Sequence, residues 1–99
     1  MKYRISAEAH NDLQSIWLYT NEKWSAEQAN RYFNLIMDEI EFICESPHSG
    51  KNYEAIRKGY FKARVKSHFI FYKINQVREE IEIIRVLHQR MDIDTRLND

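Results

Sequence analysis

The amino-acid sequence predicts an α+β fold, in which an N-terminal strand and a helical hairpin pack on an antiparallel sheet whose last three strands form a meander. The first observation is that apolar residues recur with the 3.6-residue period of a helix in two stretches before Pro47. The second is that the period drops to two after Gly59. Because helices and strands are segregated along the chain, we expect residues 1–99 to form a single domain with the helices on one face of the sheet.

The first predicted element is a short edge strand. Residues 2–5 alternate charged and apolar side chains, which places Tyr3 and Ile5 on the inward side. Ser6 follows as a candidate N-cap, because a serine hydroxyl can accept a hydrogen bond from a backbone N–H group at the start of a helix.

Two helices are predicted, near residues 7–23 and 25–45. The apolar residues of the first share one helical face and are Ala9, Leu13, Ile16, Trp17 and Trp24. Ser25 and Gln28 have the spacing of a capping box at the start of the second helix. Its apolar seam consists of Ala29, Phe33, Ile36, Ile40 and Ile43. This helix ends before Pro47, because the residue that precedes a proline avoids the helical backbone conformation.

Three antiparallel strands are predicted near residues 60–66, 68–74 and 80–87, joined by turns too short for a crossover. One face of the first strand is apolar, with Phe61, Ala63 and Val65, and its other face carries Tyr60, Lys62, Arg64 and Lys66. The other two strands are largely apolar on both faces, which indicates that they are covered on both sides. The core shared by hairpin and sheet is expected to contain Trp17, Phe33, Ile36, Ile40, Phe69, Phe71, Ile83 and Val86.

The charge of the chain is balanced overall but divided between its halves. Fifteen basic and fifteen acidic residues cancel, which argues against a general nucleic-acid binder held by bulk charge, and we expect no sequence-specific nucleic-acid binding by the chain alone. Residues 1–50 hold four Lys/Arg against eight Asp/Glu and residues 51–99 hold eleven against seven, so the halves carry about −4 and +4. The basic half either attracts an acidic partner or is attracted by the acidic helical layer within the monomer.

Several chemistries lack support in the sequence. Cys44 is the only cysteine, so no intramolecular disulfide is possible, and it is expected to pack as a small core residue. No apolar run approaches the roughly 20 residues of a membrane span, and residues 1–4 contain no apolar signal core, which predicts a cytoplasmic protein with no membrane partner. The histidines are far apart in sequence, and neither a Gly-rich phosphate loop nor a nucleophile signature occurs, so no metal site and no cofactor are expected.

The sequence resembles a known family in its most strongly patterned stretches. Residues 59–72, GYFKARVKSHFIFY, and residues 83–92, IIRVLHQRMD, closely resemble toxins of the ParE branch of the RelE/ParE superfamily. The resemblance extends to residues 3–6, to Asp12-Leu13 with Ile16-Trp17, and to residues 47–50, so it covers essentially the whole chain. It implies the toxin of a bacterial type II toxin-antitoxin system, with a ParD-like antitoxin as partner and DNA gyrase as target, and it implies the same order of strand, two helices and three strands.

Two candidate surfaces follow from the resemblance and the basic half. The loop after the last strand, consisting of His88, Gln89, Arg90 and Met91, is expected to contact gyrase, because Arg and Met are enriched at protein interfaces. The alternative is that Arg90 and Asp92 form a clamp that ends the sheet. The antitoxin is expected to order a helix and a strand in an apolar groove rimmed by basic groups, with its carboxylates on Arg57, Arg64, Lys66 and Arg85. A merely solvated strand face would carry the same basic run.

The alternative function is ribosome-dependent cleavage of messenger RNA, as in toxins of the RelE type. A nuclease site could be composed of Arg64, Lys66, His68, His88 and Arg90. Against this hypothesis, residues 92–99 contain no aromatic or histidine side chain, and Asp92, Asp94 and Asp99 would repel phosphate. The composition of this tail therefore favours a toxin that binds a protein over an enzyme that cleaves RNA. His68 is expected to have a structural role, either in closing a turn or in bonding within the core.

Overall fold

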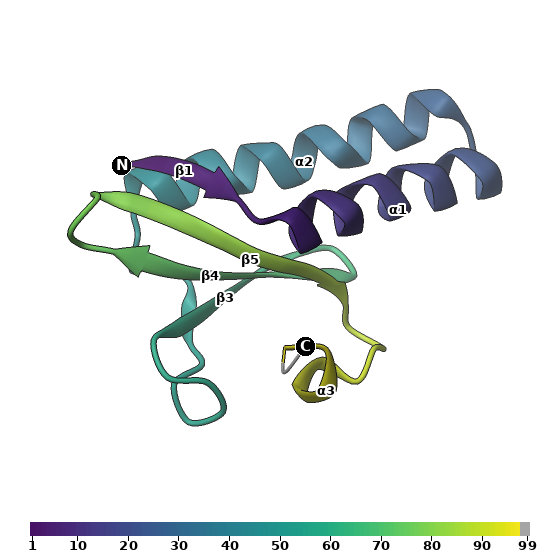
Figure 1. Cartoon of the computed structure of the whole chain (residues 1–99). Coiled ribbons are helices and arrows are strands. Elements are labelled where there is room, and N and C mark those ends of the chain that lie inside the picture. Colours follow the sequence, from purple (N-terminus) through teal and green to yellow (C-terminus); the bar gives the residue numbers. More distant parts are fainter. Residues whose placement is uncertain (98–99) are drawn as a thin grey trace.

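The structure, a computed structural model, describes residues 1–97 and contains a five-stranded sheet with a helical hairpin on one face (Figure 1). In chain order the elements are β1 (Lys2–Ile5), α1 (Ala7–Lys23), α2 (Ala26–Glu45), β2 (Lys51–Asn52), β3 (Tyr60–Val65), β4 (His68–Asn75), β5 (Glu80–His88) and α3 (Ile93–Leu97). The predicted helices and strands are thus confirmed within a few residues. Asp99, which was counted in the acidic tail, lies outside the described residues.

The sheet has the strand order β1-β5-β4-β3-β2. β3, β4 and β5 form the predicted antiparallel meander. β1 pairs in parallel with β5, from Lys2 opposite Glu80 to Ile5 opposite Ile83, so the sheet is mixed where the sequence analysis expected antiparallel pairing. The period of two that predicts a strand does not specify its neighbour or the direction of pairing.

Serine caps start both long helices. The Ser6 Oγ accepts the N–H of Ala9 at 3.0 Å, and the Ser25 Oγ accepts the N–H of Gln28 at 3.1 Å. Trp24, expected on the apolar face of α1, is instead 77% exposed. The helix ends at Lys23, and the backbone of Trp24 is not helical. The Trp24 side chain therefore does not continue the apolar face of α1.

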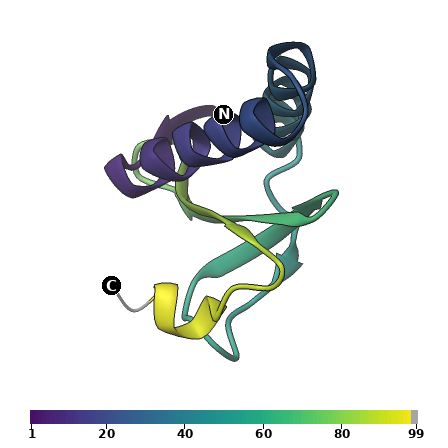
Figure 2. The same ribbon diagram turned by 90° about the vertical axis from the view of Figure 1, so that its right-hand side faces the viewer.

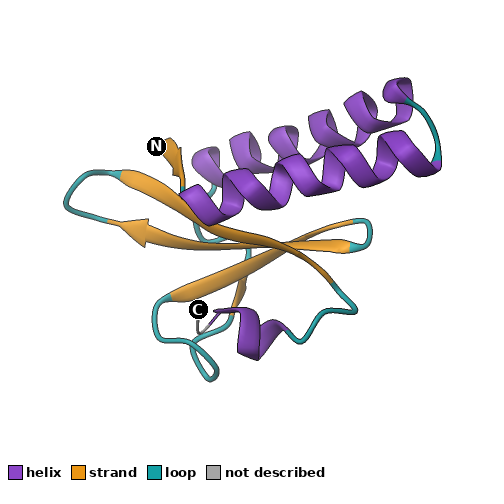
Figure 3. Cartoon of the chain, turned by 45° about the vertical axis from the view of Figure 1, so that its right-hand side comes forward, coloured by secondary structure: helices purple, strands orange, loops and turns teal. Residues whose placement is uncertain are grey.

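The helical hairpin lies on one face of the sheet and α3 on the other (Figure 3). The apolar residues form one cluster on each face. The main core lies between hairpin and sheet and contains Ala9, Leu13, Ile36, Ile40, Ile43, Cys44, Ala63, Val65, Ile70, Tyr72, Ile81, Ile83 and Val86, with Phe33 packed against it. Phe69 and Phe71 were expected in this core, and that prediction is wrong. Both lie on the other face of the sheet, in a cluster with Leu87 and Leu97. Trp17 does not belong to the main core either. β4 is apolar on both faces, so its sequence cannot specify which face meets the helices.

The C-terminal helix α3 covers the far face of the sheet, on the side opposite the hairpin (Figure 2). The Asp92 carboxylate accepts the hydroxyl hydrogen of Thr95 at 2.8 Å and so stabilises the first turn. Leu97 is buried against Phe71 and Leu87. Neither α3 nor β2 was predicted, since five and two residues are too few to display a period.

Candidate functional site

The segment that we call the β5 loop consists of His88, the last residue of β5, and of Gln89, Arg90 and Met91. Hydrogen bonds hold its backbone. The Gln89 N–H donates to the Ser67 carbonyl oxygen at 2.8 Å, and the Met91 N–H donates to the carbonyl oxygen of His88 at 3.0 Å. Between them, the Arg90 N–H donates to Nδ1 of the His88 ring at 3.0 Å. The side chains of Arg90 and Met91 are nevertheless exposed. The loop therefore presents a cation and a thioether on an ordered backbone.

The alternative interpretation, in which Arg90 and Asp92 form a clamp, is wrong. Within residues 1–97 no salt bridge joins these two side chains. The Asp92 carboxylate instead bonds Thr95 and caps α3. Asp92 thus serves the C-terminal helix, and Arg90 is not needed to end the sheet.

The basic residues expected at the antitoxin surface occupy different environments. Arg64 donates from Nη2 to Oε1 of Gln89 at 2.7 Å and from Nε to the carbonyl oxygen of Lys66 at 2.9 Å, so it supports the β5 loop directly. Arg57 donates to the carbonyl oxygen of Leu97 at 3.2 Å. Lys66 is exposed in the turn between β3 and β4 and has a positive φ of 55°. The antitoxin contacts of these residues stay predictions.

Arg85 is engaged within the chain. Its Nε and Nη2 donate to the two carboxylate oxygens of Asp12 at 2.8 and 2.9 Å, and its Nη1 donates to the carbonyl oxygen of Arg96 at 3.0 Å. The same carboxylate accepts the backbone N–H of Val86 at 2.9 Å. The Arg85 and Asp12 side chains are only 14% and 13% exposed. The structure therefore gives Arg85 a role in joining α1, β5 and α3, and its expected antitoxin contact stays untested.

His68 has the structural surroundings that the sequence analysis favoured. Its Nδ1 lies 2.6 Å from the hydroxyl oxygen of Tyr32, a residue of α2 that also donates to the Val65 carbonyl oxygen at 3.1 Å. The His68 ring stands edge-on to that of His88, with 5.0 Å between the ring centroids. Burial, followed by the proximity of His88, lowers the pKa of His68 to about 4. His68 is therefore neutral near pH 7.

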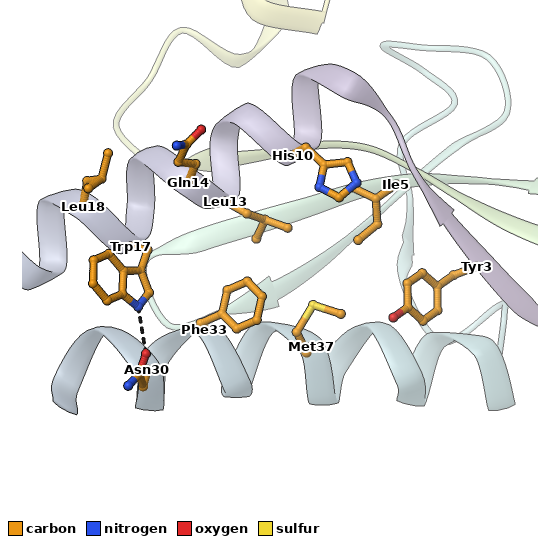
Figure 4. Close-up of a pocket in the computed structure, with 10 residues that line it drawn as sticks. All are labelled: Tyr3, Ile5, His10, Leu13, Gln14, Trp17, Leu18, Asn30, Phe33 and Met37. Carbon is orange, nitrogen blue, oxygen red and sulfur yellow. Dashed lines mark hydrogen bonds between the residues drawn. The ribbon is translucent and has the colours of Figure 1, made fainter. Parts of the chain in front are cut away.

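An apolar groove of about 760 Å³ runs between the helices of the hairpin and reaches β1 (Figure 4). It is lined by Tyr3, Ile5, His10, Leu13, Gln14, Trp17, Leu18, Asn30, Phe33 and Met37, and we call it the hairpin groove. The indole N–H of Trp17 donates to Oδ1 of Asn30 at 2.9 Å and links the helices at one end. Leu18 is 53% exposed on the rim. None of the ten lining residues is Lys or Arg, so the expected basic rim is wrong for this groove.

Two residues that join the helical hairpin to the sheet, Asp12 and Tyr32, were given no structural role from the sequence. Asp12 borders the apolar face of α1, three residues after Ala9 and four before Ile16, and a carboxylate that is buried at such a place needs a partner. Tyr32 lies four residues before Ile36 and so shares its face, with a hydroxyl that must find a hydrogen bond when buried. In both cases the signal in the sequence for such a role is a polar group on or beside an apolar helical face.

Comparison with known proteins identifies the family. Residues 3–93 match the model of the ParE toxin of the type II toxin-antitoxin system parDE. The chain belongs to the ParE toxin family. Toxin ParE1 of Caulobacter vibrioides is 43% identical over 90 residues, which is 91% of each chain, and Toxin ParE1 of Mycobacterium tuberculosis is 35% identical over 96 residues, which is 97% of each. Toxin ParE of Escherichia coli is 31% identical and covers 98% of this chain and 93% of its own.

Solved structures of the superfamily have the same fold as this ParE family member. One from the chromosomal ParDE toxin-antitoxin system of P. aeruginosa superimposes with a TM-score of 0.77 at 16% identity, and covers 89% of this chain and 95% of the other. One from the RelBE2 toxin-antitoxin complex of Mycobacterium tuberculosis gives 0.68 at 20% identity, over 88% and 95%. The predicted RelE/ParE-like fold is confirmed, and the chain is a ParE-type toxin of a type II toxin-antitoxin system.

Two structural features are absent from residues 1–97, the part of the chain that the structure describes. No group of three or more His, Cys, Asp or Glu side chains in this part of the chain is placed to hold a metal ion. No helix within it is long and apolar enough to cross a membrane.

The Asp12–Arg85 pair generates a prediction about stability. We expect Asp12→Ala to lower the free energy of unfolding by about 3 kcal/mol, because it leaves a largely buried guanidinium without its carboxylate and the N–H of Val86 without an acceptor. Arg31→Ala breaks the exposed pair between Arg31 and Glu27 and should cost about 0.5 kcal/mol or less. Urea denaturation of the two variants measures both values, and equal losses would contradict the structural role of Asp12.

The lowered pKa of His68 predicts a pH-dependent stability. Between the ordinary histidine pKa of 6.5 and the folded value of about 4, the unfolded chain binds more protons at this position than the folded chain. The stability contributed by neutral His68 is therefore complete above pH 6.5 and is lost as the pH falls toward 4. We expect the difference in unfolding free energy between the parent and His68→Gln to narrow from pH 7 to pH 4.5. A difference between the parent and His68→Gln that stays constant over this pH range would contradict the prediction.

Proposed function

We propose that this chain inhibits DNA gyrase by protein contact through the β5 loop, without catalysing a reaction, and that a ParD-like antitoxin neutralises it in the bacterial cytoplasm. The observation that carries the proposal is the ordered β5 loop, whose backbone N–H groups are bonded within the chain while Arg90 and Met91 are exposed. Such a loop loses little conformational entropy on binding. An exposed Arg beside an exposed Met suits a protein surface, because one supplies directed charged bonds and the other an adaptable apolar contact.

The arrangement of the histidines favours contact over proton transfer. A general acid or base must reach the atom that gains or loses a proton. His68 is partly covered, and its Nδ1 is bonded to the Tyr32 hydroxyl. The Nδ1 of His88 accepts the N–H of Arg90 and is occupied as well. Both histidines of the alternative nuclease hypothesis thus have one ring nitrogen bonded within the chain.

The hairpin groove is the surface that we assign to the antitoxin. An amphipathic helix binds by burying its apolar face in such a groove, and the lining here offers Leu13, Phe33 and Met37. The turn that carries Lys66 packs against α2 at Tyr32, the residue next to Phe33. An extended acidic segment that continues from the groove therefore meets Lys66, and screening by salt would slow this association.

The target contact is tested with Arg90→Ala. Removal of a central interface arginine should raise the concentration that half-inhibits gyrase supercoiling about ten-fold or more, while the thermal midpoint stays unchanged. Arg78→Ala removes an exposed arginine from the turn between β4 and β5, at the other end of the strands, and should inhibit like the parent.

Three results would contradict the proposal in different ways. Inhibition by Arg90→Ala equal to that of the parent removes Arg90 from the contact. Equal weakening by Arg78→Ala points to general electrostatic attraction. Codon-positioned cuts in messenger RNA on translating ribosomes, with gyrase unaffected, would favour the RelE-type alternative.

The antitoxin site is tested with a matched pair of leucines. Leu18, on the groove rim, and Leu35, outside the groove lining, are 53% and 39% exposed. Leu18→Glu should weaken binding of the cognate antitoxin about ten-fold or more, because it introduces a charge into the apolar contact. Leu35→Glu should change the dissociation constant by less than about three-fold. Calorimetric titration measures both, and equal affinities for the two variants would exclude the hairpin groove as the antitoxin site.

A further inference from the structure

Two histidines stand side by side where the sheet ends and the β5 loop begins. His68 is the first residue of β4 and His88 is the last residue of β5, and the strand register places them opposite each other. Their rings meet edge to face, with an interplanar angle of 86°. Such a contact restricts the rotation of the His88 ring, because that ring packs against a side chain on the neighbouring strand.

The His68 ring is itself fixed from the helical layer. The Tyr32 hydroxyl oxygen lies 2.6 Å from Nδ1 of His68, and the two rings are tilted against each other with 5.4 Å between centroids. Tyr32 extends from the middle of α2 across to the turn between β3 and β4, where its hydroxyl also donates to the Val65 carbonyl oxygen. One tyrosine thus joins the hairpin, the turn and the first histidine.

The second histidine controls the course of the β5 loop. The bond from the Arg90 N–H to Nδ1 of His88 forms only when the His88 ring has the orientation seen here. The Nδ1 atom that accepts this hydrogen carries no proton of its own. The loop backbone at Arg90 is therefore tied to the orientation of one side chain.

We propose that Tyr32 and His68 are positioning residues for the target contact, because they hold the His88 ring in the orientation that orders Arg90 and Met91. The inference rests on the proposed function, since it assigns these residues a role in the same gyrase contact. Neither residue needs to touch gyrase: the contacts run from α2 through His68 to His88 and then to the loop backbone. Binding by a loop that is already ordered avoids the entropy cost of ordering it at the interface.

Tyr32→Phe is the first test, because it removes one hydroxyl and keeps the ring. We expect hydrogen exchange of the Arg90 amide to quicken about five-fold, the size that corresponds to one net hydrogen bond, and the concentration for half-inhibition of gyrase to rise by a similar factor. Affinity for the antitoxin should change by less than about two-fold. Tyr53→Phe is the matched control, since it also removes a hydroxyl, one that donates to Asp94 in α3, and it should leave all three quantities unchanged.

Substitution of His88 separates the bond from the ring. An asparagine places its Oδ1 near the position of the histidine Nδ1, so His88→Asn retains an acceptor for the Arg90 N–H, whereas His88→Leu has none. We expect exchange of the Arg90 amide to be faster in His88→Leu than in His88→Asn, and gyrase inhibition to be partly rescued in His88→Asn.

The outcomes distinguish this inference from the proposed function. If Arg90→Ala abolishes inhibition while Tyr32→Phe inhibits like the parent with unchanged Arg90 exchange, the positioning role is refuted and the contact stands. If Tyr32→Phe and Tyr53→Phe lower the thermal midpoint equally and neither changes Arg90 exchange, Tyr32 has a structural role only. If Arg90→Ala inhibits gyrase fully, the proposed contact itself fails, whatever Tyr32→Phe does.

Discussion

The Asp12 carboxylate joins α1 to β5, and most of the structure depends on this connection. Beyond Ile83, β5 no longer has β1 beside it, so its outer edge needs other partners for its backbone groups. Asp12 from α1 accepts the N–H of Val86 there and binds the Arg85 guanidinium through both oxygens. Ser6, at the start of the same helix, donates its hydroxyl hydrogen to the Ile84 carbonyl oxygen at 2.7 Å. The first half of α1 thus takes the place of the missing strand.

Arg85 extends this connection to the C-terminal helix on the other face of the sheet. The register between β4 and β5 shifts at Phe71 and Tyr72, which lie opposite Arg85 and Ile83 and leave Ile84 as an extra residue. At this bulge the guanidinium bonds both Asp12 on the hairpin side and the Arg96 carbonyl oxygen of α3. One side chain therefore joins α1, β5 and the C-terminal helix, and the β5 loop leaves the sheet between these fixed points. A loop in that place is restrained at both ends.

The sequence predicts where the helices and strands lie, but it does not predict which of them pair or pack together. Ser6, Ser25 and Pro47 delimit the long helices because capping and proline geometry act locally. Phe69 and Phe71 were assigned to the wrong face because β4 is apolar on both sides, and packing between residues distant in sequence decides which side meets the hairpin. The candidate loop was found by resemblance, whereas Tyr32 and Asp12 act through contacts 36 and 73 residues away in sequence. No local pattern encodes such pairings.

The turn between β3 and β4 relates the two proposed surfaces to each other. The hairpin groove and the β5 loop consist of different residues, so a helix that fills only the groove leaves Arg90 and Met91 exposed. Ser67 of this turn accepts the N–H of Gln89, and Val65 before it accepts the hydroxyl hydrogen of Tyr32. Lys66 therefore lies next to both α2 and the loop. Under the proposed function, an antitoxin segment that runs from the groove onto Lys66 reaches the border of the gyrase contact, and neutralisation then follows from steric overlap at this turn without any change in the fold of the toxin.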